Sequence, residues 1–334
     1  MKDSISQLEF IVPAEHAGER LDRFLSLQMP ETSRTRVQSL IDEGRVRVDG
    51  VARKPSVRIV PGESVTVEIP PAPPAGVESE DIPLEILYED EDVAVVNKPA
   101  GMVVHPGAGV GGGTMVAALL HRFGGIEGLS TVGGPMRPGI VHRLDKETSG
   151  ALVIARNNTA HHRLVEEFRE RLVEKSYLAL LHGRVKNDAG SVELPIARDL
   201  RRRSRKTARR REGRQARTDW RVILRFSGHT LVEARIHTGR THQIRVHFSA
   251  LGCPVVGDTL YGAPRQEHAG SELVHHLGRN FLHAARVAFA HPRTGERVEI
   301  RAPLPPELWA YVKDLARVSG TDQGLVDAAL RNFL

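Results

Sequence analysis

A run of four prolines within seven residues, 70–76, is the feature that most constrains how this chain can fold. Consecutive prolines favour the extended polyproline II conformation, and they cannot join a helix or a central strand. The run therefore predicts a semi-rigid spacer between two separately folded parts. The 334 residues are enough for a small first domain and a larger second domain with a sizeable core.

The part before the spacer, 18–69, has the pattern of a compact accessory domain. Two amphipathic segments at helical spacing come first, and Ser33 can cap the second. β-prone segments at 46–48 and 64–69 follow, bounded by glycine-containing turns. This order of helix, helix and strand, with a Val-Asp-Gly turn after the first strand, is similar to the S4 RNA-binding domain.

The resemblance to the S4 domain implies that its basic side chains contact RNA phosphates, because the second helix and the following strand would present them together. The alternative is a solvated charged face, which scattered arginines usually form. The candidate phosphate contacts are Arg34, Arg36, Arg45, Arg47, Arg53 and Lys54.

The larger part opens near Pro83 with strand-like apolar runs at 84–87 and 93–96, and a glycine-rich stretch follows at 107–113. A phosphate-binding loop is one interpretation of that stretch, but no Gly-Lys-Ser or Gly-Lys-Thr comes after it. We therefore expect a mobile surface loop before a helix that starts near Thr114.

A charged motif separates two apolar segments, 139–141 and 151–155, that have the pattern of strands. Its sequence is His142-Arg143-Leu144-Asp145-Lys146-Glu147-Thr148-Ser149-Gly150. The neighbouring arginine and lysine favour the ionised form of the Asp145 carboxylate, which suits a nucleophile better than a general acid. A surface ion pair in a turn is the alternative. That alternative does not account for the small residues 148–150, which let backbone or a ligand approach closely.

This motif resembles the signature of the RluA-type family of RNA pseudouridine synthases, in which the aspartate is the essential catalytic residue. The resemblance extends over about residues 18–310. Further segments that match the family, in the expected order, are 98–107, Lys175-Ser176-Tyr177, 238–245, 252–258 and Tyr261-Gly262.

The family resemblance implies a role for each matching residue. Asp145 would be the catalytic carboxylate, Tyr177 would stack against uracil, and Arg245 would be the basic residue paired with Asp145. Arg143 would take the place of a flipped-out nucleotide. The apolar lining of the uracil site would come from Leu144, Ile244 and Val246.

The segment between the two catalytic motifs predicts how Tyr177 reaches the site. Asn158 or Thr159 can cap a helix in which Leu164, Phe168 and Leu172 share one face. A strand over 175–181 follows, and such a crossover can bring neighbouring strand ends together. A buried core tyrosine is the alternative for Tyr177.

The segment 198–217 is dense in arginine and is opposed only by Asp199 and Glu212. Because no hydrophobic period runs through it, we expect a flexible loop rather than a packed element. Such runs are often merely solvated, but phosphate contact is expected here. Deleting 204–211 should then lower RNA affinity and the dependence of that affinity on salt. The expected contacts are Arg202, Arg205, Lys206 and Arg210, with Arg240 from the third motif.

Three histidines spaced by five residues, His237, His242 and His247, suggest a zinc site, but this spacing forms no recognised ligand pattern. Cys253 is the only cysteine, which excludes an intramolecular disulfide and a thiolate metal site. We therefore expect no metal, and we expect no cofactor because isomerising uridine involves no net redox change and adds no outside group.

The net charge of +6 is compatible with a polyanionic partner. The N-terminus lacks the apolar core of a signal peptide, and no run approaches the roughly 18 apolar residues of a membrane span. A single cysteine fits a reducing compartment. We therefore expect a cytoplasmic protein that has no membrane partner.

The expected fold class is α+β, with a small S4-like module and a larger, mostly antiparallel sheet of the pseudouridine synthase type. Late strands at 281–287 and 297–300 precede a helix that starts at Pro305-Pro306. The expected organisation is an N-terminal extension at 1–17, an S4-like domain at 18–69, a Pro-rich linker at 70–82, a catalytic domain at 83–318 and a C-terminal helix at 319–334.

The expected activity is isomerisation of uridine to pseudouridine in large-subunit ribosomal RNA, or in a nascent ribosomal particle, by a monomer. The arrangement of an S4-like and a catalytic domain resembles the RluD subtype, which acts in the helix 69 stem-loop. The alternatives are a synthase of the same family for other large-subunit sites, a non-catalytic RNA-binding or ribosome-assembly protein, and a metal-dependent hydrolase that uses the histidines.

Overall fold

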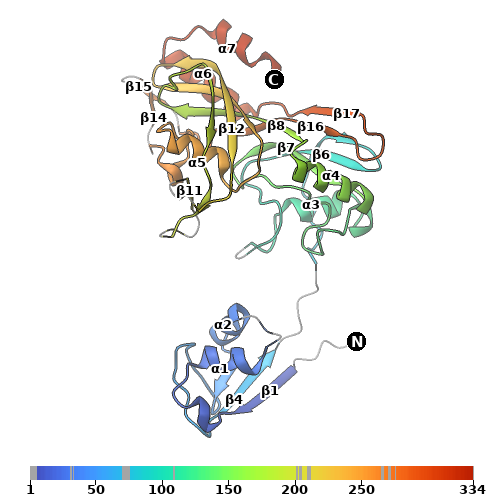
Figure 1. Cartoon of the computed structure of the whole chain (residues 1–334), viewed down its shortest axis with the longest axis vertical. Coiled ribbons are helices and arrows are strands. Elements are labelled where there is room, and N and C mark those ends of the chain that lie inside the picture. The colour runs from blue at the N-terminus through green and yellow to red at the C-terminus, as the bar shows by residue number, and fades with distance from the viewer. Residues whose placement is uncertain are drawn as a thin grey trace. The chain divides into compact units, whose positions relative to one another are not determined.

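The chain forms two compact units, Met1–Ala75 and Gly76–Leu334 (Figure 1). The prolines at 70–74 lie outside the described residues. The computed structural model describes residues 6–30, 32, 34–69, 76–107, 110–200, 202, 205–208, 212–264, 267–269, 272–274 and 276–333.

The first unit, blue in Figure 1, packs two helices on a four-stranded antiparallel sheet of order β1-β4-β2-β3. Its core is formed by the apolar stripes of both helices and the inward residues of the strands, such as Phe24, Leu40 and Val65. Its elements are β1 (Ser6–Ile11), η1 (Ala14–His16), α1 (Leu21–Gln28), α2 (Arg34–Asp42), β2 (Val46–Val48), β3 (Val51–Ala52) and β4 (Ser64–Ile69).

Residues 6–11 take part in this sheet. Residues 1–17 were expected to be an extension outside the accessory domain, but β1 pairs with the whole of β4, from Ser6 opposite Ile69 to Ile11 opposite Ser64. Phe10 also packs against the core of the unit. The pairing covers the edge of β4, which would otherwise expose its unpaired backbone groups.

The second unit is built on a nine-stranded sheet of order β5-β6-β7-β16-β8-β13-β12-β9, with β17 paired to β16. In the described sheet β7 and β16 run parallel, and the other neighbouring strands are antiparallel, which confirms the α+β class. The strands are β5 (Glu85–Glu89), β6 (Val93–Lys98), β7 (Ser149–Ala155), β8 (Glu174–His182), β9 (Ala189–Glu193), β12 (Arg217–Phe226), β13 (His229–Ile236), β16 (Leu282–Ala290) and β17 (Arg297–Arg301).

Alternation along the central strands divides the core between the two faces of this sheet. On β8, Tyr177, Ala179 and Leu181 join the cluster that includes α3 and α5, whereas Leu178 and Leu180 join the cluster of α6 and α7. The helices are α3 (Met115–Arg122), α4 (Asn158–Glu170), α5 (Gln243–Ala250), α6 (Pro306–Val318) and α7 (Gln323–Leu330), with the short turns η2 (Ile126–Gly128), η3 (Thr259–Tyr261) and η4 (Arg331–Phe333). None of the helices in the described residues is long and apolar enough to cross a membrane.

Several local predictions differ from the structure. Residues 139–141 form no strand, and Ile140 makes only an isolated bridge to Ile154. Helix α4 is capped by Asn157, whose side chain accepts from the Ala160 N–H, and Leu172 lies beyond the helix end with 66% of its surface exposed. These differences arise because hydrophobic periodicity predicts that an element is present but does not fix its first and last residues.

The arginine-rich segment contains a small hairpin, β10 (Ala197–Arg198) with β11 (Lys206–Thr207). It was expected to be a loop without packed structure, because no hydrophobic period runs through it. The hairpin instead packs against Tyr261 from the second unit's core, a contact that the local sequence does not encode. A second small hairpin joins β14 (Glu267–Ala269) and β15 (Glu272–Val274).

Candidate active site

A cavity of about 400 Å³ lies where the loop before β7, strand β8 and the start of α5 meet. Its lining combines one carboxylate with several cationic and several apolar side chains. The residues that line it are Val141, His142, Arg143, Leu144, Asp145, Thr148, Val165, Phe168, Arg169, Lys175, Tyr177, Ile236, Gly239, Arg240, Thr241, His242, Gln243, Ile244, Arg245 and Leu282.

The loop that carries Asp145 is held at two positions that follow this residue in the chain. At its far end, Gly150 has φ 114°, and a Cβ there would lie 2.3 Å from the Ala284 carbonyl oxygen. Only glycine therefore allows β16 to pair with the start of β7. Directly after Asp145, the Lys146 carbonyl accepts hydrogen bonds from the Gly101 N–H at 2.9 Å and from Lys98 Nζ at 3.0 Å. Gly150 and the hydrogen bonds to the Lys146 carbonyl therefore position the Asp145 carboxylate.

Arg245, on the first turn of α5, lies between two carboxylates. Its Nη1 donates to Asp145 Oδ2 at 3.0 Å, while Nε and Nη2 donate to Asp258 at 2.6 and 3.0 Å. Burial opposes the charge of Arg245, but its hydrogen bonds and ion pairs with Asp258 and Asp145 outweigh that effect and raise its pKa above the ordinary value. The two sides of one guanidinium therefore connect a buried anchor to the carboxylate in the cavity.

Tyr177 forms part of the cavity wall and is almost fully buried on β8. Burial, with a contribution from the Asp145 charge, raises the pKa of its phenol well above the usual value. The phenol therefore stays protonated near neutral pH, so it can donate a hydrogen bond but cannot act as a base.

The remaining predicted site residues fall on different sides of the cavity. Arg143 lines it, is exposed, and its Nη1 lies 3.4 Å from His105 Nε2. Leu144 and Ile244 also line the cavity. Val246 is not among the residues that line the cavity. It follows Ile244 by two positions on α5, and such residues point about 200° apart around the helix axis. It packs instead in a small cluster with Ile196, Ala216 and Tyr261.

Two lining residues that the sequence did not single out contribute unusual electrostatics. Lys175 precedes Tyr177 by two residues on β8, so both face the cavity, and burial lowers the pKa of its ammonium to about 8. Burial, with the nearby Lys175 charge, lowers the pKa of His142 to about 3, so this ring stays neutral and its Nε2 accepts from the Val153 N–H. The sequence could have indicated Lys175, because residues two positions apart on a strand face the same side and Tyr177 was already expected at the site.

The three histidines of the third motif do not converge. His237 contacts Asp219 at 2.6 Å, His247 contacts Thr218 and the Leu194 carbonyl, and His242 contacts Tyr261. Each ring therefore serves a separate hydrogen-bonding site, and the spacing of five residues does not correspond to a shared ligand set.

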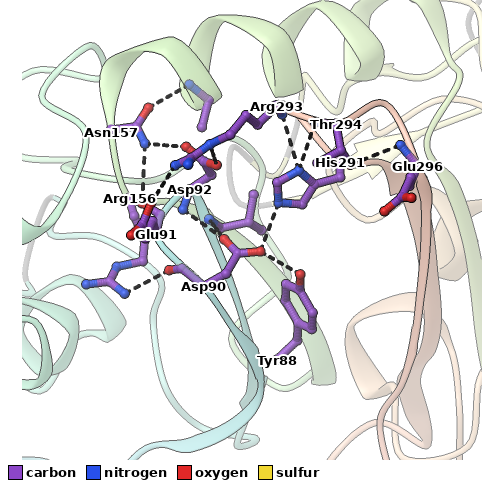
Figure 2. A network of polar contacts seen from close by, with 12 residues as sticks. Tyr88, Asp90, Glu91, Asp92, Arg156, Asn157, His291, Arg293, Thr294 and Glu296 are labelled. Atoms are coloured by element: carbon purple, nitrogen blue, oxygen red, sulfur yellow. Dashed lines mark hydrogen bonds and ion pairs between the residues drawn. The ribbon is translucent and has the colours of Figure 1, made fainter.

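A group with metal-ligand chemistry does occur elsewhere in the described residues, at Asp90, Asp92 and His291 (Figure 2). Its ligand atoms are already engaged: His291 Nδ1 accepts from two backbone N–H groups, so Nε2–H donates to Asp90 at 2.8 Å. Asp92 accepts from Arg293 Nε at 2.6 Å. The network connects the turn between β5 and β6 to the turn between β16 and β17, and we interpret it as a structural contact.

The candidate RNA contacts in the first unit lie on its surface where they are described. Arg34 pairs with the buried Asp22 at 3.2 Å and keeps 61% of its side chain exposed. Arg45 pairs with Glu43, and Arg47 donates to the Gly50 carbonyl. Arg53 and Lys54 are exposed, and the Arg36 side chain lies outside the described residues.

The candidate contacts in the second unit are less uniform. Arg202 is exposed, whereas the Arg205 guanidinium carbon lies 5.2 Å from the centre of the Tyr261 ring. Lys206 is half-buried, and Arg210 lies outside the described residues. Arg240 lines the cavity, where burial, with the charges of Arg214 and Arg171, lowers its pKa.

Two family models match this chain. Residues 92–250 match the model described as RNA pseudouridylate synthase, and this range includes the Asp145, Tyr177 and Arg245 positions. Residues 19–65 match the S4 domain.

Relatives of similar length cover most of the chain. An uncharacterized RNA pseudouridine synthase from Aquifex aeolicus is 48% identical over 293 residues, which is 86% of this chain and 90% of the relative. The ribosomal large subunit pseudouridine synthase D of Xanthomonas campestris is 42% identical over 303 residues, 89% of each chain. Among solved structures, human RNA pseudouridylate synthase domain containing 4 is similar, with a TM-score of 0.54 and 28% identity over 69% of this chain and 92% of that chain.

Proposed function

This chain belongs to the RNA pseudouridylate synthase family, and we propose that its substrate is large-subunit ribosomal RNA. It is an RNA pseudouridine synthase with an S4 domain. The reaction breaks the bond from ribose C1′ to uracil N1 and remakes it from C1′ to C5. The same atoms are present before and after, so no outside group is transferred and no net oxidation occurs.

The contact between Arg245 and Asp145 is the observation that carries the proposed catalytic role of Asp145. An ionised carboxylate at this position serves attack on ribose C1′, attack on uracil C6 and removal of a ribose proton, and each route needs the same negative charge. The guanidinium, with Nη1 at 3.0 Å from Asp145 Oδ2, fixes the direction of the carboxylate. Asp258 keeps the guanidinium in place from its other side.

The cavity around Asp145 supports a role in holding uracil during the exchange. Tyr177 offers an aromatic face for stacking and a protonated phenol that can orient uracil, and Leu144 and Ile244 add apolar surface. A detached uracil must remain enclosed while it turns from N1 to C5. Contacts with the lining residues would limit loss of the base to solvent.

The target uridine must leave its stack to reach this cavity, because C5 and C1′ are inaccessible in a stacked helix. We assign to Arg143, which is exposed and lines the cavity, the role of filling the vacated place. Extruding a nucleotide costs on the order of a few kcal/mol. Phosphate contacts from the S4 domain and from the arginine-rich segment would offset this cost.

The proposed target is the helix 69 stem-loop of large-subunit ribosomal RNA. It is supported by relatives called ribosomal large subunit pseudouridine synthase D, which are 39–42% identical to this chain over most of their length. We propose that 18–69 recruits this RNA, that the prolines of 70–82 act as a spacer, and that 83–318 catalyses the reaction as a monomer.

Asp145→Asn tests the catalytic assignment, because it keeps the size of the side chain and removes its charge. We expect no pseudouridine formation, with RNA affinity close to that of the unmodified protein. Asp188→Asn is the matched control, since Asp188 is exposed on the surface and pairs with Arg225. Full activity of Asp145→Asn would refute the assignment.

Mapping pseudouridines in large-subunit ribosomal RNA, with and without the purified protein, tests the target. New pseudouridines in helix 69 are expected. Pseudouridines at other large-subunit positions would instead assign the chain to another subtype of the same family. RNA that stays unmodified at every position would contradict the proposed substrate.

A further inference from the structure

His242 lies beside the proposed catalytic carboxylate but has no role in the reaction described above. Its Nε2 is 4.0 Å from Asp145 Oδ2, which is longer than a hydrogen bond and close enough for a strong electrostatic effect. The residue has φ 59°, a left-handed conformation that residues other than glycine adopt rarely. Such a conformation persists only where the surroundings hold it.

The other ring nitrogen of His242 is held by Tyr261. The Tyr261 hydroxyl lies 2.8 Å from His242 Nδ1, and it also accepts from the Lys206 backbone N–H at 2.8 Å. The tyrosine ring is buried, with the guanidinium carbons of Arg245 and Arg205 at 5.1 and 5.2 Å from its centre. These cation–π contacts keep the ring in place, so the hydroxyl has little freedom to move.

The hydrogen positions follow from these contacts. The Lys206 N–H can only donate, so the Tyr261 oxygen accepts there and has one hydrogen left to give. If that hydrogen is donated to His242 Nδ1, the ring carries its own hydrogen on Nε2, which faces the negative Asp145 oxygen. The opposite tautomer would place the Nε2 lone pair toward that oxygen and leave the tyrosyl hydrogen without an acceptor among the described residues.

A doubly protonated ring is disfavoured at this position. Burial is the largest effect that lowers the pKa of His242, and the charges of Arg245 and Lys206 lower it further, against the opposing effect of Asp145 and Asp258. The ring is therefore neutral near neutral pH. Its tautomer decides whether an N–H or a lone pair of Nε2 faces Asp145.

We propose that His242 and Tyr261 are positioning residues for Asp145, and that the hairpin β10–β11 sets their orientation through the Lys206 backbone N–H. The order of donation is Lys206 N–H to Tyr261, Tyr261 O–H to His242 Nδ1, and His242 Nε2–H toward Asp145. The arginine-rich hairpin, which is expected to contact RNA, thereby acts on the carboxylate in the cavity. The catalytic consequence rests on the proposed function of Asp145, whereas the tautomer does not.

The tautomer can be measured directly from the nitrogen-15 chemical shifts of histidine rings in the full-length protein, with the His242 signals identified by their loss in His242→Gln. We expect a bare Nδ1 and a protonated Nε2 in the unmodified protein, and loss of this preference in Tyr261→Phe. Tyr88→Phe is the matched control, because it removes a hydroxyl that contacts Asp90 far along the chain from the third motif. A protonated Nδ1 in the unmodified protein would overturn the proposal.

Single-turnover kinetics tests the effect on catalysis. Removing one hydrogen bond that orients a reacting group should slow Tyr261→Phe about tenfold at saturating RNA, with RNA affinity unchanged. The amide of His242→Asn reaches only the position of ring Nδ1, whereas the amide of His242→Gln reaches the position of Nε2 and can donate toward Asp145. The glutamine variant should therefore be faster than the asparagine variant. A Tyr261→Phe protein as fast as Tyr88→Phe would refute the positioning role.

The two measurements separate this proposal from the proposed function. If the unmodified protein forms no pseudouridine, the proposed function fails, and the ring nitrogens still report whether Tyr261 sets the tautomer. If the protein is active and the tautomer is the opposite one, the proposed function stands and the positioning role of His242 is refuted.

Discussion

At the scale of single residues, the site depends on cationic side chains that are buried against their preference for water. Arg245 has two carboxylates as partners. Lys175 differs, because its ammonium contacts the Phe168 ring at 5.1 Å and has no acidic partner in the described part of the chain. Burial of a charge without a partner costs stability, and such residues are typical of functional sites.

The cost of burying Lys175 gives a prediction for stability against pH. Its pKa is about 8 in the folded chain, below its value in the unfolded chain, so the unfolded chain binds more protons between the two values. Stability therefore rises as the pH increases from about 8 to about 10.4, and the charge destabilises the folded chain by about 3 kcal/mol at lower pH.

Replacing the ammonium should remove this penalty. We expect Lys175→Met to raise the denaturant midpoint at neutral pH, and the two proteins to converge above the unfolded-state pKa. Lys313→Met is the control, because Lys313 is exposed and also lies over an aromatic ring, that of Trp309. Equal midpoints for Lys175→Met and the unmodified protein at neutral pH would contradict the inferred burial cost.

At the scale of elements, the position of Asp145 depends on the parallel pairing of β7 and β16. This pairing joins Ser149 to His283 and Gly150 to Ala284. It inserts β16 between β7 and β8. Strand β7, which follows Asp145, and strand β8, which carries Tyr177, are therefore not direct neighbours. The crossover through α4 therefore leaves room for a strand that comes more than a hundred residues later.

Gly150→Ala should disrupt this pairing. A Cβ at 2.3 Å from the Ala284 oxygen forces the strands apart, and the positive φ adds strain, so we expect a loss of at least about 3 kcal/mol and of activity. Gly228→Ala is the control, since Gly228 also has a positive φ but open space around it. The measurement is thermal unfolding with a parallel activity assay. Equal effects of both substitutions would show that the close approach of β16 is not required.

At the scale of the whole molecule, the proposed recruitment and the proposed chemistry belong to different compact units. The first unit has its own core of buried apolar residues, and the second contains every residue around the cavity. Linking a binding module to a catalytic one raises the effective concentration of substrate without a new contact at the active site.

Removing residues 1–75 should therefore weaken RNA binding more than catalysis. We expect a dissociation constant increased by about 10-fold or more, and a shallower dependence of binding on salt because fewer phosphates are neutralised. The rate at saturating RNA should remain close to that of the full chain. Circular dichroism would first establish that 76–334 is folded, and an unchanged salt dependence would exclude the first unit from phosphate contact.

Local pattern was enough to predict many of these features. The strand at Glu174–His182, the S4 pattern and the charged motif around Asp145 all depend on neighbouring residues, because periodicity and turn chemistry act over short stretches. The family motifs also identified Arg245 as a partner of Asp145, although the two are separated by 100 positions.

Only the tertiary structure decided which side chains meet. It placed Ile244 at the cavity and Val246 away from it, anchored Arg245 on Asp258, and brought Lys206 to Tyr261 and His242. Contacts of this kind join segments that are far apart in sequence, and they depend on how complete elements pack and pair. A local stretch of sequence determines the period of its own element, whereas the neighbours of that element are determined by the free energy of the whole fold.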